Sequence, residues 1–210
     1  MQDIIYYARY VDDIIVMFVP RPTESNRNYI EELKNIVEIQ NQLSLNPNKT
    51  FSYDLRGTSF LYQVDYLGYK ISFGDGKVKT NLTDKKIDRY KERIRMTFDE
   101  YLNLSKIDEK RARKLLVKRI RFLCGNTKLV NNKKNILVGI FYSNRHLNQL
   151  DDLLRLDNSL DTHINLKITS QHLVERLKKY SFLKGFQEKS FSVFKTSELN
   201  EIVKLWANNR

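Results

Sequence analysis

Two short apolar runs near the N-terminus constrain the fold more than any other feature of this sequence. Ile4–Ala8 and Ile14–Phe18 are rich in β-branched and aromatic residues, and only residues 9–13 separate them. Runs of this length and composition are typical of β-strands. The segment is therefore predicted to form a β-hairpin, with the adjacent Asp12 and Asp13 at or near its tip.

Two neighbouring carboxylates on a tight turn are suited to binding magnesium. Mg²⁺ prefers hard oxygen ligands, usually one or two carboxylates completed by phosphates and water. The alternative is an ordinary turn, because aspartate also favours turns through local hydrogen bonds. Taken by themselves, Asp12 and Asp13 leave both interpretations open.

Length and composition indicate a globular protein. The chain has 210 residues, enough for one domain or one and a half with a real core, and its 41% hydrophobic residues and few glycines and prolines argue against disorder. The longest apolar run, Ile14–Val19, is far shorter than the roughly 20 residues of a membrane span. We expect a soluble, cytoplasmic protein without a membrane partner.

The single cysteine is expected to be a buried thiol. Cys124 has no partner for an internal disulfide, and the scattered His146, His163 and His172 give no zinc-ligand spacing with it.

The formal net charge of +12 is unevenly distributed. Residues 1–80 carry nine Lys/Arg and ten Asp/Glu, a net charge of −1, whereas residues 85–121 carry fourteen and six, a net charge of +8. A cationic block beside clustered carboxylates favours a polyanionic partner, because Lys and Arg neutralise phosphates in nucleic-acid complexes. A basic helical surface that is merely solvated is the alternative.

The segment after the hairpin is predicted to be a helix. Pro20-Arg21-Pro22 ends the strand, Thr23 or Ser25 can cap the helix, and the helix runs to about Leu43. Its apolar residues share one face that would lie against a sheet; they are Tyr29, Leu33, Ile36, Val37 and Leu43.

The pattern then returns to strands before it becomes helical. A turn-rich link over residues 45–51 leads to a strand over 60–73, and residues 74–76 turn the chain into a strand over 77–80. From Thr83 onward only helices are predicted, at about 84–102, 108–124, 136–156, 170–180 and 197–206. This order predicts two units with a boundary near residues 80–83.

Three local features follow one another in the order found in a known family. They are the Tyr10-Val11-Asp12-Asp13 hairpin, the Asn46–Thr50 turn, and the strand Tyr66-Leu67-Gly68-Tyr69-Lys70-Ile71. Together they resemble consecutive motifs in the second half of a reverse transcriptase palm, and the basic helices after them resemble its thumb. The similarity is closest to bacterial enzymes of the retron, group II intron and abortive-infection (phage-defence) types, and it is strongest over residues 3–73.

The resemblance implies an α+β fold in three parts. Residues 1–82 would be a partial polymerase palm, an antiparallel sheet with a packed helix. Residues 83–130 would be a basic, all-helical thumb, and residues 131–210 a helical C-terminal extension.

The resemblance also implies the roles of individual residues. Asp12 would bind the catalytic Mg²⁺ ions directly, with Asp13 as a second or indirect ligand; paired ions about 3.5–4 Å apart can stabilise the attacking and leaving oxygens of one displacement. Lys49 would lie near the departing pyrophosphate and donate a proton or neutralise charge, unless it is a solvated turn lysine. Tyr10 would face the primer end, or else pack on the sheet.

The family's primer-binding hairpin corresponds to the strand around Gly68. A glycine inside a strand often marks the close approach of another backbone, here the primer, with Leu67 and Tyr69 beside it; a β-bulge glycine is the alternative. In the thumb, basic residues would contact phosphates: Lys85, Lys86, Arg89, Arg93, Lys110, Arg113, Lys114, Lys118 and Arg121. The aromatic rings of Tyr90, Tyr101 and Phe122 are expected in the core and not as stacking platforms.

The sequence departs from the family pattern at one point. The family requires a further metal-binding aspartate on a strand well before the hairpin, together with fingers that hold template and nucleotide. Asp3 is the only acidic residue before Asp12 and is not assigned that role. We therefore expect a C-terminal part of a longer polymerase or a truncated product, with an incomplete two-metal site, weak or no activity alone, and an exposed apolar sheet edge and face.

The implied function is that of an RNA-directed DNA polymerase, which transfers nucleotides to a primer 3′ end with magnesium, in a setting such as anti-phage defence. The implied partners are an RNA template, a DNA or RNA–DNA duplex, deoxynucleoside triphosphates and the missing N-terminal palm and fingers. The alternatives are a non-catalytic nucleic-acid-binding remnant or subunit, and a palm polymerase that acts on RNA only.

Overall fold

The computed structural model describes residues 4–19, 27–55, 62–74, 76–129 and 136–207. It is an α+β structure with small antiparallel sheets, as the sequence predicts. The chain divides into two compact units, residues 1–62 and 63–210. Each is described separately.

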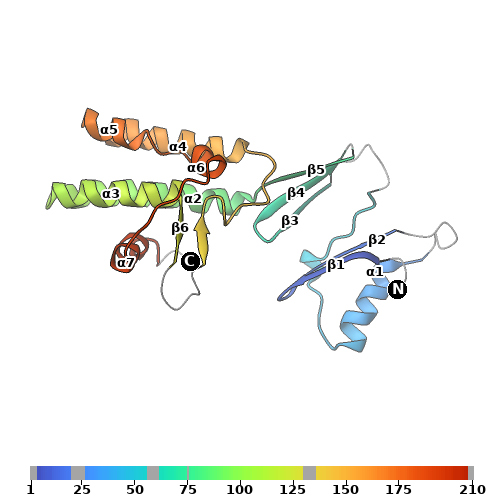
Figure 1. The fold of residues 1–210 in the computed structure, drawn as a ribbon. Coiled ribbons are helices and arrows are strands. Elements are labelled where there is room, and N and C mark those ends of the chain that lie inside the picture. Colours follow the sequence, from blue (N-terminus) through green and yellow to red (C-terminus); the bar gives the residue numbers. More distant parts are fainter. Residues whose placement is uncertain (1–3, 20–26, 56–61, 75, 130–135, 208–210) are drawn as a thin grey trace. The chain divides into compact units, whose positions relative to one another are not determined.

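The first unit begins with the predicted hairpin. Strands β1 (Ile4–Tyr10) and β2 (Asp13–Phe18) are antiparallel, and the closing pair is Tyr10 with Asp13, so Val11 and Asp12 form a two-residue turn (Figure 1). The hairpin prediction, with the aspartates at its tip, is confirmed.

The helix of this unit is shorter than predicted. Helix α1 (Tyr29–Lys34) continues into a π-helical segment, η2 (Asn35–Gln40), instead of reaching Leu43. Its N-cap is Asn28, whose Oδ1 accepts a hydrogen bond from the Glu31 amide at 3.2 Å. The predicted caps, Thr23 and Ser25, lie outside the described residues. After η2, the short 3₁₀ turn η3 (Pro47–Lys49) forms where the lysine turn was expected.

The first unit buries very little apolar surface. Among its described residues only Tyr29 is buried, stacked on Phe18 with ring centroids 4.4 Å apart. Large side chains on the hairpin remain exposed, including Ile5 at 65% and Tyr7 at 56%. This agrees with the expected exposure of an apolar sheet, and a two-stranded hairpin of this kind is only marginally stable by itself.

The second unit opens with a three-stranded sheet in the order β3-β4-β5, formed by β3 (Tyr62–Tyr66), β4 (Tyr69–Gly74) and β5 (Lys77–Leu82). The prediction of one continuous strand over residues 60–73 is wrong, because Leu67 and Gly68 form a turn between β3 and β4. Both turn residues have a positive φ, 48° and 80°, which is typical of a tight two-residue hairpin.

The sheet belongs with the helices, whereas the sequence placed the boundary between units near residues 80–83. Side chains from far along the chain satisfy the outer edge of β5. Asn148 accepts a hydrogen bond from the Thr80 amide at 2.8 Å and donates one to the Val78 carbonyl at 2.8 Å. The buried Asp152 carboxylate accepts from the Leu82 amide at 3.0 Å.

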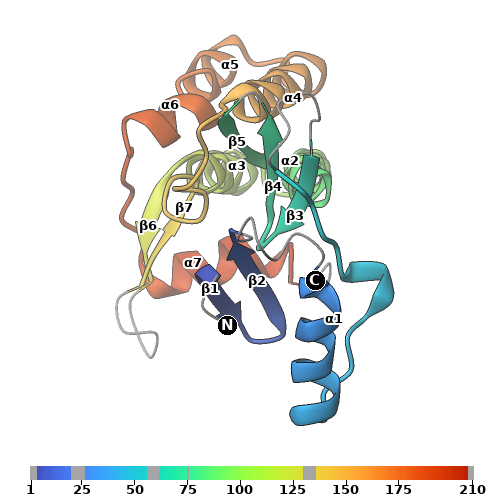
Figure 2. The ribbon, with the colours of Figure 1, turned by 90° about the vertical axis from the view of Figure 1, so that its right-hand side faces the viewer.

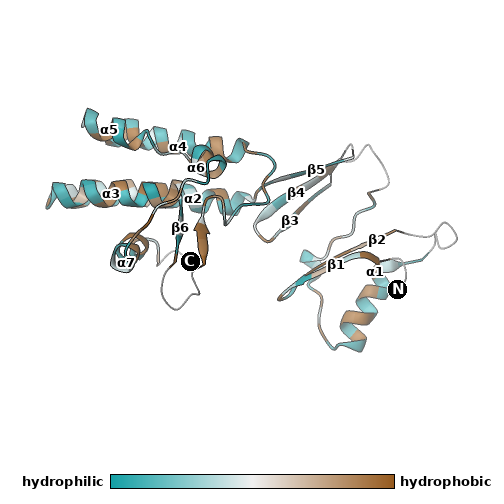
Figure 3. Ribbon diagram, viewed as in Figure 1, coloured by the Kyte–Doolittle hydropathy of each residue, from teal (hydrophilic) through white to brown (hydrophobic). Residues whose placement is uncertain are grey.

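The helical part is built on α2 (Asp84–Ser105) and α3 (Glu109–Cys124), both as predicted, followed by α4 (Asp151–Lys167), α5 (Gln171–Leu177), α6 (Phe182–Gln187) and α7 (Thr196–Lys204). Helix α2 packs against both α3 and α4. Bands of hydrophobic residues recur along these helices (Figure 3). The side chains in the core include Ile94, Phe98, Leu116, Ile120, Leu156 and Leu160, all at most 1% exposed.

The prediction of a helix over residues 136–156 is wrong. Strands β6 (Asn126–Lys128) and β7 (Leu137–Gly139) form a hairpin beside α3, and turns lead on to α4 (Figure 2). The buried amide of Asn126 holds this region together: it donates to the carbonyls of Gly185 and Ser190 and accepts from the Phe141 amide. Because the partners of Asn126 are distant in sequence, no local sequence pattern predicts these contacts.

The buried thiol is confirmed. Cys124 is 3% exposed at the end of α3, and burial raises the pKa of its thiol. Tyr101 is buried, and Tyr90 and Phe122 pack against the same core, as expected for these aromatic rings.

Gly185 allows α6 to approach the end of α3. A β-carbon at this position would lie 1.7 Å from the carbonyl oxygen of Cys124. Gly185→Ala is therefore expected to lower the free energy of unfolding by about 3 kcal/mol, the upper end of the usual cost of overpacking, although alanine is the better helix former. Urea denaturation followed by circular dichroism measures this. Gly76→Ala is the control, because no atom lies within 4 Å of the added carbon. Its positive φ of 64° alone should lower the free energy of unfolding by about 1–2 kcal/mol. Equal losses in the two variants would contradict the close approach.

Candidate metal and nucleic-acid site

The hairpin turn presents both aspartates to solvent. Asp12 is the second turn residue and Asp13 the first residue of β2, and both side chains are exposed. Val11 has a φ of 58°, a conformation that a β-branched residue rarely adopts, and it costs about 1–3 kcal/mol. Arg9 supports this turn, since its Nε donates to the Val11 carbonyl at 2.8 Å. The turn is thus held in an unusual conformation directly beside the two carboxylates.

The residue types at the turn fit a magnesium ion, but the turn supplies only part of a ligand set. Two carboxylates can bind one hydrated Mg²⁺, whose remaining positions are taken by water or phosphate oxygens. Within the described part of the chain, no group of three or more His, Cys, Asp or Glu side chains is placed to hold a metal ion. Asp12 and Asp13 would therefore need further ligands from a substrate or another strand.

Tyr10 precedes the turn, and its side chain is 60% exposed. The ring is therefore not fully packed on the sheet. Packing on the sheet was the alternative to the predicted position facing the primer end.

Lys49 lies on a well-formed turn. The Asn46 side chain accepts from the Asn48 amide at 3.0 Å, and the Asn46 carbonyl accepts from the Lys49 amide and the Thr50 hydroxyl. The Lys49 side chain is exposed. Among the described residues, no hydrogen bond or ion pair joins it to either aspartate, so its predicted catalytic role remains a prediction.

Gly68 has a different local role from the one predicted. It lies in the β3–β4 turn and not inside a strand or a bulge, and its φ of 80° favours glycine. The group that approaches Gly68 is a side chain of the same unit. A β-carbon on Gly68 would lie 3.4 Å from Cδ of Lys86. Leu67 is 42% exposed on the same turn.

The partly buried Lys86 is engaged by groups of its own unit. Its ammonium donates to the Ser143 carbonyl at 3.1 Å and lies 4.9 Å from the centre of the Tyr69 ring, and the Tyr69 hydroxyl donates to the same carbonyl at 3.4 Å. Burial, with the nearby charge of Arg89, lowers the pKa of Lys86 to about 8. The structure thus brings together Gly68, Tyr69 and Lys86, but it makes Lys86 a support for the turn.

The candidate cations of α2 and α3 fall into two groups. Several are engaged by other side chains. Arg113 pairs with Glu109 at 2.6 Å and Lys118 with Glu198 at 2.7 Å. The guanidinium groups of the other two lie over aromatic rings, Arg93 over Trp206 at 5.6 Å and Arg121 over Phe194 at 4.5 Å. The remaining candidates are exposed: Lys85, Arg89, Lys110 and Lys114.

The C-terminal segment covers one side of α3, which sequence analysis missed. Phe122 contacts both Phe194 and Trp206, with ring centroids 6.0 Å apart in each pair. Two glutamates of α7 reach cations of α3: Glu198 pairs with Lys118, and Glu201 with Arg111 at 2.9 Å. The amphipathic pattern predicted α7 as a helix, but no sequence signal identified the helix that it contacts.

Comparison with known proteins gives no relative for this chain. No family model, no curated protein and no solved structure matches it. Across the described residues, none of the helices combines the length and apolar character that crossing a membrane requires.

The Lys118–Glu198 pair predicts a pH dependence of stability. Hydrogen bonds from Lys118 and from the Lys195 amide hold the pKa of the Glu198 carboxyl at about 2, below its usual 4.5. Because the carboxyl is more acidic in the folded state, its contribution is complete above pH 4.5 and is lost as the pH falls toward 2. Glu198→Gln should therefore lower the melting temperature at pH 7. The difference in melting temperature between this variant and the unmodified protein should disappear as the pH falls from 4.5 toward 2.

Thermal denaturation at a series of pH values measures this gap. Glu175→Gln removes an exposed carboxylate of α5 that accepts a hydrogen bond from Gln171 of the same helix, and it serves as the control. A gap that stays constant from pH 7 to pH 2 would contradict the assigned role of the pair.

Proposed function

We propose that this chain is part of an RNA-directed DNA polymerase of bacterial reverse transcriptase type, which extends a primer 3′ end with deoxynucleotides. The observation that carries the proposal is the placement of Asp12 and Asp13, two exposed carboxylates at the two-residue turn of an antiparallel hairpin. Val11 is strained, and a hydrogen bond from Arg9 supports its conformation. Strain of this kind is typical of functional sites, where the turn holds particular side chains in place.

Individual residues of the chain would have the following roles. Asp12 and Asp13 would hold magnesium, which when bound stabilises the attacking and leaving oxygens of the displacement. Lys49, exposed on its capped turn, would neutralise charge on the departing pyrophosphate. The exposed Lys85 and Arg89 of α2 would bind phosphates of the template–primer duplex without reading its sequence.

Further parts of the proposal follow from the resemblance. The substrates would be a template of RNA, a DNA or RNA primer and deoxynucleoside triphosphates, and the biological setting would be cytoplasmic phage defence. A polypeptide that carries the further aspartate and the fingers would complete the metal site, whose two aspartates do not suffice for a pair of ions.

A second candidate is non-catalytic nucleic-acid binding. The observation that favours it is the set of exposed cations on α2 and α3, namely Lys85, Arg89, Lys110 and Lys114, which need no metal to bind phosphate. The two candidates differ in their dependence on Asp12.

Asp12→Ala separates them in a complete polymerase, in which this chain is combined with the polypeptide that supplies the further aspartate. Loss of a direct metal ligand is expected to reduce primer extension on an RNA template by at least about a hundredfold, since even supporting groups of metal ligands are worth 10–100-fold. Salt-dependent binding of the primer–template should remain nearly unchanged. Extension of a labelled primer and fluorescence anisotropy measure the two effects.

Asp65→Ala is the matched control, because Asp65 is an exposed strand carboxylate that belongs to β3 of the other unit and not to the hairpin. Full extension by the Asp12→Ala enzyme would reject the catalytic proposal and leave the binding function.

The chain by itself, incubated with primed RNA, deoxynucleotides and magnesium, is expected to extend the primer weakly or not at all. Among the described residues, the two turn carboxylates leave too few ligands for a pair of magnesium ions. Gel analysis of the labelled primer checks this. Robust extension without any added partner would show that the metal site is complete within the chain.

A further inference from the structure

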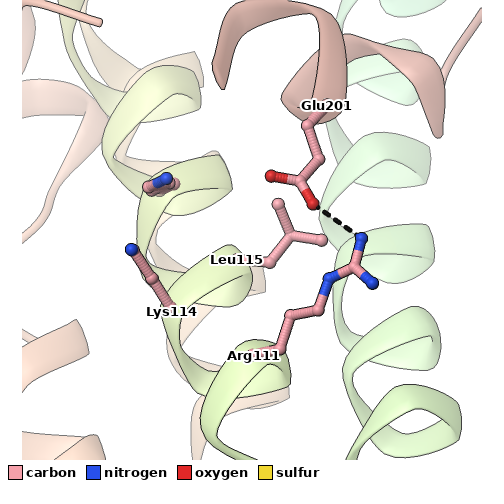
Figure 4. A pocket seen from close by; sticks show the side chains of 5 residues that line it. Arg111, Lys114, Leu115 and Glu201 are labelled. Atoms are coloured by element: carbon pink, nitrogen blue, oxygen red, sulfur yellow. Dashed lines mark hydrogen bonds and ion pairs between the residues drawn. The ribbon is translucent and has the colours of Figure 1, made fainter. Parts of the chain in front are cut away.

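A small cavity lies between α3 and α7 in the second unit, and none of the residues that line it belongs to the hairpin or the lysine turn. It has a volume of about 230 Å³ and is lined by Arg111, Lys114, Leu115 and Lys118 of α3 and by Glu201 of α7. Figure 4 shows Arg111 and Glu201 directed toward each other across it, with Lys114 on the neighbouring turn of α3. Three cationic residues therefore line one opening.

The two carboxylates of α7 only partly neutralise these cations. Arg111 Nη2 lies 2.9 Å from Glu201 Oε1, and Lys118 Nζ lies 2.7 Å from Glu198 Oε1. Lys114 makes no hydrogen bond or ion pair with any described residue, and it is exposed. The cavity thus keeps one positive charge that no side chain around it balances, beside an arginine suited to oxygen anions.

The Glu201 carboxylate at the cavity can be exchanged without displacing α7. The helix is anchored by apolar side chains, with Leu199 at 7%, Ile202 at 0% and Trp206 at 4% exposure. The ion pair at the cavity is open to solvent, since the Arg111 and Glu201 side chains are 61% and 40% exposed. An exposed pair of this kind is weak, so an anion with more charge and more acceptor oxygens can replace the carboxylate.

We propose that the α3–α7 cavity is a phosphate-binding site in which Glu201 occupies the position of the ligand when no phosphate is bound. Arg111 and Lys114 take the phosphate beside Lys118, which keeps its ion pair with Glu198, and Glu201 turns away toward solvent. The phosphate belongs to a nucleic-acid backbone or to a free polyphosphate such as pyrophosphate. The nucleic-acid form of this site rests on the nucleic-acid binding proposed above, and neither form depends on catalysis at Asp12.

Binding of a single-stranded RNA of about twelve nucleotides to the full chain tests the proposal. At low salt, Glu201→Gln is expected to raise the affinity about threefold, because the competing carboxylate is gone. Lys114→Ala is expected to lower it about threefold and to make the salt dependence shallower by about one phosphate contact, roughly 0.7 in the logarithmic slope. Fluorescence anisotropy over a series of salt concentrations measures both, and melting temperatures show that the variants fold.

Two matched variants make the same charge changes elsewhere. Glu175→Gln and Lys178→Ala alter exposed residues of α5 and its C-cap, away from the cavity. If each has the same effect as its cavity counterpart, only net charge matters and the proposal is wrong. Loss of binding in a Lys85→Ala, Arg89→Ala variant while the cavity variants bind normally would also overturn it, yet would support nucleic-acid binding. Failure of every protein to bind RNA or pyrophosphate would reject both.

Competition by millimolar pyrophosphate distinguishes the two sources of the phosphate. If pyrophosphate removes the part of RNA binding that depends on Lys114, the site accepts a free polyphosphate. If pyrophosphate has no effect and the cavity variants behave as expected, the site is specific for a nucleic-acid backbone.

Discussion

The burial of one apolar face of α2 between α3 and α4 is the interaction on which the second unit depends. Ile94 and Phe98 are fully buried there, in the same core as Ile120 of α3 and Leu160 of α4, and each such side chain contributes about 1.5–3 kcal/mol. The first unit has nothing comparable, because Tyr29 is its one buried side chain among the described residues. The hairpin with the aspartates thus belongs to a unit whose described residues have little packing of their own, and a partner surface would stabilise it.

The same packing decides which cations of α3 can meet a ligand. Helix α7 is held on α3 by apolar anchors, and from there it engages Lys118 and Arg111 through its glutamates. Because these glutamates neutralise part of it, the positive charge that residues 85–121 present to solvent is smaller than their net charge in the sequence. Lys114 both lines the cavity and is exposed.

Local patterns predicted the elements well and their partners poorly. The hairpin around Asp12, the helices α2 and α3 and the buried Cys124 follow from strand composition, helical periodicity and the absence of a cysteine partner. The break at Leu67-Gly68 could have been recognised, since a glycine after a short apolar run is also a turn signal. The side chain of Asn148 along β5, the hub at Asn126 and the hydrogen bond of Lys86 depend on contacts more than 50 residues apart, which periodicity does not encode.

Binding of a divalent ion at the hairpin turn is the claim on which the proposed function rests most directly. Mn²⁺ takes the same oxygen ligands as Mg²⁺ and broadens the NMR signals of nearby nuclei. Titration of Mn²⁺ into ¹⁵N-labelled protein should broaden the amide signals of Val11, Asp12 and Asp13 before that of the exposed Asp65, and excess Mg²⁺ should restore them. Uniform broadening at all exposed carboxylates, or unchanged broadening at the turn in Asp12→Ala, would contradict a metal site there.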